Sequence, residues 1–149
     1  MSLAAILTPD RTQGCITGSS KKRVLEKVAD FICADIPALD AGVLFKQLIG
    51  REKLGSTGIG EGVAIPHCRI DKCPGITGAL IRLQEAVDFD AIDEQPVDLL
   101  FVLLVPQQAC EEHLQILAEL ARFFSRAEVR QALREAPDGA AMYDIAVNF

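Results

Sequence analysis

Apolar residues recur along this chain with two different spacings, one typical of helices and one typical of buried strands. Val24, Val28 and Phe31 follow the helical spacing, Ser20 can cap the helix start, and Pro37 can end the helix. Asp40 and Asp138 are further possible caps. The same reasoning predicts helices at 41–49, 109–124, 127–135 and 138–147, with Gly50 just past the end of the first of these.

Strands are indicated by short apolar runs. Residues 97–105 are apolar at nearly every position and Pro106 follows them, so we expect both faces of this strand to be covered. Shorter strands are predicted at 63–65 and 76–83. Because strands and helices alternate, the sequence predicts an α/β fold in which helices cover both faces of a sheet.

The length and composition fit one globular domain over residues 1–149. The net charge of −6 makes nucleic acid a poor candidate partner and suits a basic protein partner. The longest apolar run, 99–105, is far shorter than the roughly 20 residues of a membrane span. With no signal-peptide pattern at the start and five cysteines without a CxxC motif, we expect a cytoplasmic protein with reduced thiols.

A glycine-rich stretch leads to the first candidate for chemistry. Four glycines occur within residues 55–62, which indicates unusual backbone dihedrals or a close approach to another group. The stretch lacks the Gly-Lys-Ser/Thr ending of a Walker motif, and it precedes a strand, unlike a dinucleotide fingerprint. We therefore expect no nucleotide cofactor.

His67 follows this stretch directly after Pro66, which should hold it firmly at the end of a strand. Its imidazole can act as a nucleophile near neutral pH and form a phosphoramidate. His113 is expected in the first turn of a helix that follows another strand, so the two histidines could share a site. An ordinary polar role for His113 is an equal alternative. Arg51 could hold phosphate oxygens, although a solvated arginine is the commoner role.

Two other kinds of site compete with this hypothesis. His67, Cys68 and Cys73, together with Cys110 and His113, supply ligand types that zinc prefers, but their spacing is weak. A hydrolase active site is a weaker hypothesis still, because no third residue that could orient the histidine of a catalytic triad is evident. We therefore expect no metal, while a metal-binding interaction module remains the rival from another class.

Residues 52–68, EKLGSTGIGEGVAIPHC, resemble the phosphohistidine signature of enzyme IIA domains of the mannitol–fructose class, from the bacterial phosphoenolpyruvate-dependent phosphotransferase system. The segments ILTPDRT, SSKKRVLEKV and AIDEQPVDLLFVLLVP extend the resemblance over nearly the whole chain and favour its nitrogen-regulatory branch.

The resemblance implies a five-stranded mixed β-sheet flanked by helices and a phosphocarrier without a cofactor. His67 would accept the phosphoryl group from an HPr-like phosphocarrier, and Arg51 and His113 would help to hold it. The cysteine at position 68 stands where glycine is common in that branch. Regulatory targets such as potassium transporters or sensor kinases are implied, with a sugar-specific enzyme IIA that feeds a permease as the alternative.

Overall fold

The computed structural model describes residues 2–109 and 111–149. Within them the chain forms two short 3₁₀ helices, six strands and five α-helices, and strands β2 to β6 follow one another without a helix between them. In chain order these are η1 (Leu3–Ala5), η2 (Pro9–Arg11), β1 (Thr12–Ile16), α1 (Lys21–Asp35), α2 (Ala41–Leu54), β2 (Gly58–Gly60), β3 (Val63–Ala64), β4 (His67–Ile70), β5 (Thr77–Val87), β6 (Val97–Pro106), α3 (Glu112–Ser125), α4 (Ala127–Glu135) and α5 (Gly139–Asn148).

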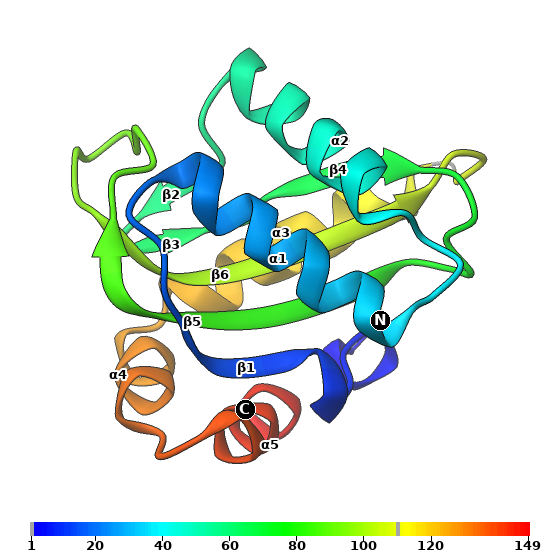
Figure 1. Cartoon of the computed structure of the whole chain (residues 1–149). Coiled ribbons are helices and arrows are strands. Elements are labelled where there is room, and N and C mark those ends of the chain that lie inside the picture. Colours follow the sequence, from blue (N-terminus) through cyan, green and yellow to red (C-terminus); the bar gives the residue numbers. More distant parts are fainter. Residues whose placement is uncertain (1, 110) are drawn as a thin grey trace.

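One sheet of mixed pairing organises the molecule (Figure 1). Its order is β1-β5-β6-β3-β2, and β4 also pairs with β6. Strands β1 and β5 are parallel, β5 and β6 are antiparallel, and both β3 and β4 run parallel to β6. Helices α1 and α2 cover one face, while α3, α4 and α5 lie on the other, as expected for an α/β fold.

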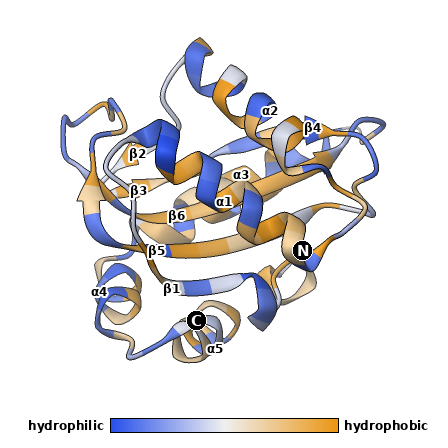
Figure 2. Ribbon diagram, in the orientation of Figure 1, coloured by the Kyte–Doolittle hydropathy of each residue, from blue (hydrophilic) through white to orange (hydrophobic). Residues whose placement is uncertain are grey.

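The central strand β6 divides the core into two halves, because successive side chains of a strand point to opposite faces. Leu100, Val102 and Leu104 pack with α1 and α2, whereas Leu99 and Phe101 pack with α3, α4 and α5. All five are fully buried, which confirms that both faces of this strand are covered. Figure 2 shows hydrophobic colour along most of β6 and along the middle of β5.

The expectation of five strands was wrong by one, because Pro66 interrupts what would otherwise be a single strand. Val63 pairs with Leu99 and His67 pairs with Leu103, so β3 and β4 keep the same register along β6. Proline has no N–H to donate to a ladder, and the pairing breaks there. The sheet thus has six strands, of which β3 and β4 lie end to end along the same edge of β6.

Three helices begin at the predicted caps, whereas the end of α2 and the start of α3 differ from the prediction. The side chains of Ser20, Asp40 and Asp138 cap α1, α2 and α5. Helix α2, however, continues through Gly50 and ends at Leu54 with Gly55 as its C-cap, and α3 begins three residues later than predicted. Gly50 is tolerated within the helix because the last turn is held by side-chain contacts described below. Strand β1 was not predicted, since its five residues include a glycine and few apolar side chains.

Among the described helices, none combines the length and apolar composition that crossing a lipid bilayer requires.

Candidate functional site

A pocket of about 460 Å³ opens at the edge of the sheet, where β4 has α2 on one side and the start of α3 on the other. All three candidate residues line it: Arg51 from the last turn of α2, His67 from the first position of β4, and His113 from the first turn of α3. The other lining residues are Gln47, Gly50, Leu54, Cys68, Arg69, Val105 and Gln107. The structure therefore brings together three residues that are up to 62 positions apart in the sequence.

The half-buried ring of His67 is oriented by a hydrogen bond to its own strand. Its Nδ1 lies 2.8 Å from the carbonyl oxygen of Ile65. A carbonyl oxygen can only accept, so Nδ1 carries the proton and the lone pair of a neutral ring is on Nε2. Pro66, which lies between the two residues, restricts the backbone of this turn. His67 is thus held as a single tautomer with Nε2 as its nucleophilic atom.

Arg51 is the immediate neighbour of that atom. Its Nε–H donates to Nε2 of His67 at 3.3 Å, which requires the same tautomer, and its Nη1 donates to the carbonyl oxygen of Gly55 at 2.9 Å. The sequence had placed Arg51 in the connection after α2, but the helix includes it. A position in the last helical turn fixes the guanidinium more firmly than a loop would.

The surroundings lower the pKa of His67. Burial has the largest effect, because it disfavours the charged imidazolium, and the positive charge of Arg51 acts in the same direction, as does His113. The hydrogen bond to Ile65 and the negative charge of Glu52 oppose this lowering without cancelling it. His67 is therefore mostly neutral near pH 7, as a nucleophile must be.

Arg69 supports the opposite side of the pocket. Its Nη1 donates to the carbonyl oxygens of Pro106, Gln107 and Ala109 at 3.4, 3.2 and 2.7 Å. These carbonyls belong to the segment between β6 and α3, so Arg69 braces the segment that leads to His113. The sequence analysis missed this arginine. The signal was its position two residues after His67 on a strand, which puts both side chains on the same face.

The glycine-rich stretch does not cradle the pocket, contrary to what its composition suggested. Among the described residues that line the pocket, none comes from 55–62. Gly60 and Gly62 instead have positive φ angles of 97° and 77° in the turn from β2 to β3. A Cβ on Gly62 would lie 2.5 Å from Nη2 of Arg134, so this glycine lets α4 approach the turn.

The cysteines near the site behave as core residues. Burial raises the pKa of the Cys68 thiol to about 12, and nearby Cys73 adds to the rise, so this thiol stays protonated and is a poor nucleophile. In the part of the chain that the structure describes, no three His, Cys, Asp or Glu residues are grouped to hold a metal ion. Cys110 lies outside the described residues.

The second residue that the sequence analysis missed as a site component is Glu52, which it quoted only as part of a motif. Its side chain is 2% exposed and is paired with Lys21 at 2.9 Å. A carboxylate this deeply buried is unusual unless it is paired, and the motif itself offered the only clue.

Taken together, the pocket presents a neutral nucleophilic imidazole whose reactive nitrogen faces a guanidinium, with a second imidazole nearby. A guanidinium suits the oxygens of a phosphoryl group, and a histidine can form a covalent phosphoramidate. The arrangement is therefore suited to reversible phosphoryl transfer.

Comparison with known proteins agrees with this chemistry. Residues 5–148 match the family described as "Phosphoenolpyruvate-dependent sugar phosphotransferase system, EIIA 2". The chain is 51% identical over 146 residues to a nitrogen regulatory protein of Pseudomonas aeruginosa, covering 98% of this chain and 95% of that protein. It is 42% identical over 114 residues to a fructose-specific EIIA component of Haloferax volcanii, covering 72% and 74% of the two chains.

Among solved structures, the chain is similar to the nitrogen regulatory protein IIA-Ntr from Neisseria meningitidis, with a TM-score of 0.87 and 39% identity over 97% of this chain and 98% of that one. The match of the family model over almost the whole length, the relative at 51% identity and the shared fold point to one conclusion. This chain belongs to the EIIA 2 family of the phosphoenolpyruvate-dependent phosphotransferase system, and its relatives include nitrogen regulatory proteins.

Proposed function

We propose that Nε2 of His67 accepts a phosphoryl group from an HPr-like phosphocarrier and that the phosphorylated and free forms of this protein act differently on regulatory targets. Family membership and the nitrogen regulatory relatives make the chain a regulatory component of a phosphotransferase system. The observation that carries the choice of atom is the hydrogen bond from Nδ1 to Ile65, which leaves the lone pair on Nε2.

The transfer is an in-line displacement. The lone pair of Nε2 forms a bond to phosphorus while the nitrogen–phosphorus bond of the donor phosphohistidine breaks, and the donor ring keeps that electron pair and takes up a proton. His67 keeps the proton on Nδ1 throughout, so the carbonyl oxygen of Ile65 stabilises the positive charge that develops on the ring. Positioning and charge stabilisation are the main tasks of a protein in such a step.

Arg51 has two successive contacts in this proposal. In the free protein its Nε–H donates to Nε2 of His67. Because a phosphoryl group would occupy that position, the guanidinium moves to the phosphoryl oxygens, which accept from it more strongly than a neutral nitrogen does. His113, on the opposite wall, contributes a second donor.

Phosphorylation would add nearly two negative charges to a pocket that is lined by the two cations Arg51 and Arg69. A change of this size can create or abolish a contact with a partner, which is how a carrier of this type could regulate. Candidate targets are potassium transporters and sensor kinases.

Intact-mass spectrometry after incubation with a phosphoenolpyruvate-charged HPr-like donor tests the proposal. We expect one added phosphoryl group that is lost in acid, as a phosphoramidate should be. His67→Ala should abolish the labelling while the circular dichroism spectrum remains unchanged. Labelling that persists in this variant would rule out His67 as the acceptor.

A second candidate function is transfer onward to a sugar permease, which the similarity to the fructose-specific component of Haloferax volcanii favours. Incubating the phosphorylated protein with membranes that contain a fructose or mannitol permease distinguishes the two functions. A regulatory carrier should keep its phosphoryl group under these conditions, whereas a sugar-specific component should lose it in a sugar-dependent manner.

A further inference from the structure

A buried carboxylate, that of Glu52, lies beside the candidate site, next in sequence to the pocket residue Arg51. Glu52 follows Arg51 in the last turn of α2, but its side chain points into the molecule and is 2% exposed. Burying a carboxylate costs free energy unless its oxygens are paired, so the partners of this side chain show what keeps it buried.

Both oxygens of Glu52 are occupied. Oε2 pairs with Nζ of Lys21 at 2.9 Å, at the start of α1. Oε1 accepts a hydrogen bond from the hydroxyl of Thr57, and the backbone N–H of Thr57 donates to Oε1 and Oε2 at 3.2 and 3.3 Å. Lys21 also lies 5.2 Å from the ring centre of buried Phe89. Glu52 thus joins the start of α1, the end of α2 and the segment before β2.

From Thr57 the hydrogen bonds continue to the nucleophile. The carbonyl oxygen of Thr57 accepts from the backbone N–H of Ile65 at 3.0 Å, and the carbonyl oxygen of Ile65 accepts from Nδ1 of His67 at 2.8 Å. Ile65, whose carbonyl oxygen fixes the ring of His67, is therefore itself held through its N–H by Thr57, and Thr57 is held by Glu52.

The same carboxylate also fixes the cation of the site. Because consecutive helical residues point about 100° apart, anchoring Glu52 inside the molecule sets the rotation of the last turn and directs Arg51 toward β4. One buried group thereby sets both partners of the 3.3 Å contact between Arg51 and His67.

From these contacts we propose that Glu52 is a positioning residue for phosphoryl transfer, acting through Thr57 and Ile65 on the ring of His67 and through the helix on Arg51. The inference rests on the proposed function of His67. It assigns a task to the Lys21–Glu52–Thr57 cluster that goes beyond holding the fold together.

The charge of Glu52 supports this assignment independently of the hydrogen bonds. It raises the pKa of His67 against the larger lowering effect of burial. Replacing Glu52 by glutamine should therefore lower the pKa of His67 further. A residue that only stabilised the fold, far from His67, would not produce this change.

The test compares Glu52→Gln, Thr57→Val and Thr57→Ser with the wild-type chain, and uses Asp98→Asn as the matched control. Asp98 forms an ion pair with Arg134 at 2.9 Å. On β6 it lies five positions before Leu103, the residue that pairs with His67. The control thus makes the same change from acid to amide and also removes an ion pair, but away from the pocket.

We expect Glu52→Gln and Thr57→Val to slow transfer from the charged donor about 10- to 100-fold through kcat, with KM nearly unchanged because the surface around the pocket is intact. Thr57→Ser should restore the rate, since it keeps the hydroxyl donor. NMR titration should show a lower His67 pKa in Glu52→Gln than in the wild type. Asp98→Asn should change neither the rate nor the titration.

Wild-type kcat in folded Glu52→Gln and Thr57→Val, with an unchanged His67 titration, would overturn the proposal. If Glu52→Gln does not fold, the comparison of Thr57→Val with Thr57→Ser tests the proposal by itself. Equal rates of phosphoryl transfer in these two variants would contradict it. If the wild-type chain accepts no phosphoryl group at all, the proposed function fails, while the His67 titration still reports whether Glu52 acts on the ring.

Discussion

The two ring nitrogens of His67 have different neighbours, and this difference decides which of them can react. Nδ1 donates to Ile65, whereas Nε2 faces the pocket beside Arg51. Burial and the adjacent cation lower the pKa of the ring. At pH 6.5, where an unperturbed histidine is about half protonated, most of the His67 population should still be neutral and nucleophilic.

Replacing Arg51 should therefore change the titration of His67 in a defined direction. Arg51→Met removes a positive charge that lowers the pKa of His67, so that pKa should rise. NMR titration of the ring carbons measures the shift. Lys53→Met is the matched control, since it removes an exposed cation from the same helical turn and should leave the His67 titration nearly unchanged. A pKa that falls in Arg51→Met would contradict the electrostatic role.

His113 should matter for the rate of transfer and not for its occurrence. It lines the pocket with Arg51, but in the proposed mechanism the bond to phosphorus forms at Nε2 of His67. His113→Ala should slow transfer by roughly 10- to 1000-fold, since removing one donor that stabilises developing charge costs up to about 10³-fold. Single-turnover labelling by a charged donor measures this. An unchanged rate would remove His113 from the site.

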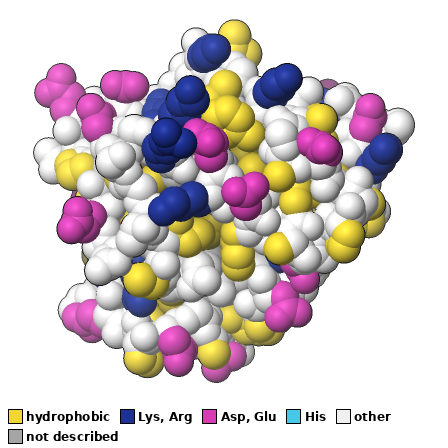
Figure 3. Space-filling view, viewed as in Figure 1, with side chains coloured by type: hydrophobic (Ala, Val, Ile, Leu, Met, Phe, Trp, Pro, Cys, Tyr) yellow, Lys and Arg dark blue, Asp and Glu magenta, His cyan; other side chains and the backbone are white. Residues whose placement is uncertain are grey.

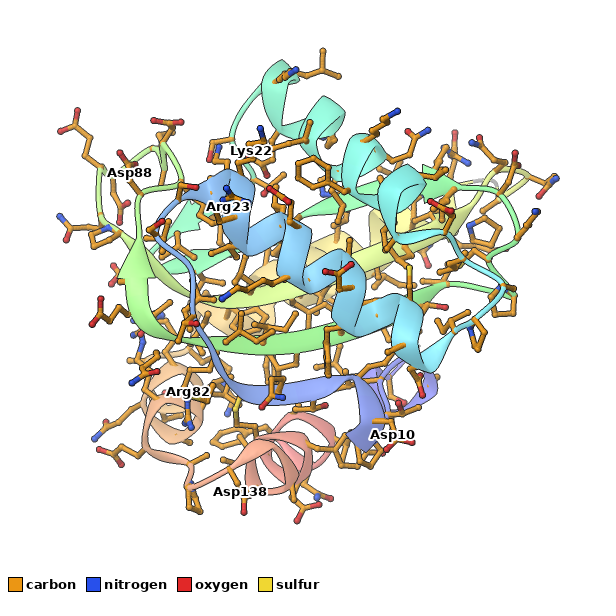
Figure 4. The ribbon with its side chains drawn as sticks, viewed as in Figure 1. Asp10, Lys22, Arg23, Arg82, Asp88 and Asp138 are labelled. Atoms are coloured by element: carbon orange, nitrogen blue, oxygen red, sulfur yellow. The ribbon has the colours of Figure 1, made fainter. Side chains whose placement is uncertain are left out.

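At the scale of the elements, two arginines on strands do the same structural task at different ends of the sheet. Arg69 on β4 donates to three carbonyls in the connection before α3. Arg82 on β5 donates to the carbonyl oxygens of Leu133, Arg134 and Ala136 at the end of α4. Figure 4 shows Arg82 extending from β5 toward α4. Only the first of the two braces lies beside the pocket.

This pair permits a controlled experiment. Arg69→Met and Arg82→Met should each lower the free energy of unfolding by about 1–3 kcal/mol, because each removes several hydrogen bonds to carbonyl oxygens. Only Arg69→Met should also slow phosphoryl transfer, since it releases the segment that leads to His113. Denaturant unfolding and single-turnover labelling give the two quantities. Equal transfer rates in the two variants would show that the position of α3 does not limit the reaction.

At the scale of the whole molecule, the pocket opens where two helices present exposed leucines. Leu54 at the end of α2 is 85% exposed, and Leu114 at the start of α3 is 55% exposed. On the face that α1 and α2 cover, basic side chains gather over the start of α1 and the end of α2, and acidic side chains lie beside them and towards the edges of this face (Figure 3). An apolar rim around a recessed nucleophile is a suitable surface for docking a protein donor.

Charged substitutions on this rim should weaken docking without changing chemistry. We expect Leu54→Asp and Leu114→Asp to raise KM for the protein donor about tenfold, which corresponds to a loss of about 1.4 kcal/mol, with kcat nearly unchanged. Phe149→Asp is the control, because Phe149 is 47% exposed at the C-terminus, beside α5 and across the molecule from α2 (Figure 1). Steady-state kinetics with varied donor should show this contrast, and an equal KM for all three variants would contradict docking on the rim.

The local pattern of apolar and capping residues was sufficient to predict most of the fold. Strand β6, the caps Ser20, Asp40 and Asp138, and the helices on both faces were predictable, because hydrophobic periodicity and capping are local properties. The end of α2 was not, since Gly50 reads locally as a helix end while Glu52 and Arg51 are held in the helix by contacts with distant residues. The strand end at Pro66 was predicted, but its continuation as β4 beyond Pro66 depended on pairing with β6.

For the candidate site, the sequence by itself determined which groups are available: one histidine after Pro66, a second histidine near a helix start, and an arginine before the glycine-rich stretch. Only the tertiary structure decided that these three share a pocket, that Gly60 and Gly62 form a turn that does not line it, and that Glu52 is buried beside it. The physical reason is that residue chemistry is local, whereas distance, burial and hydrogen-bond partners depend on how β4, α2 and α3 meet at the edge of the sheet.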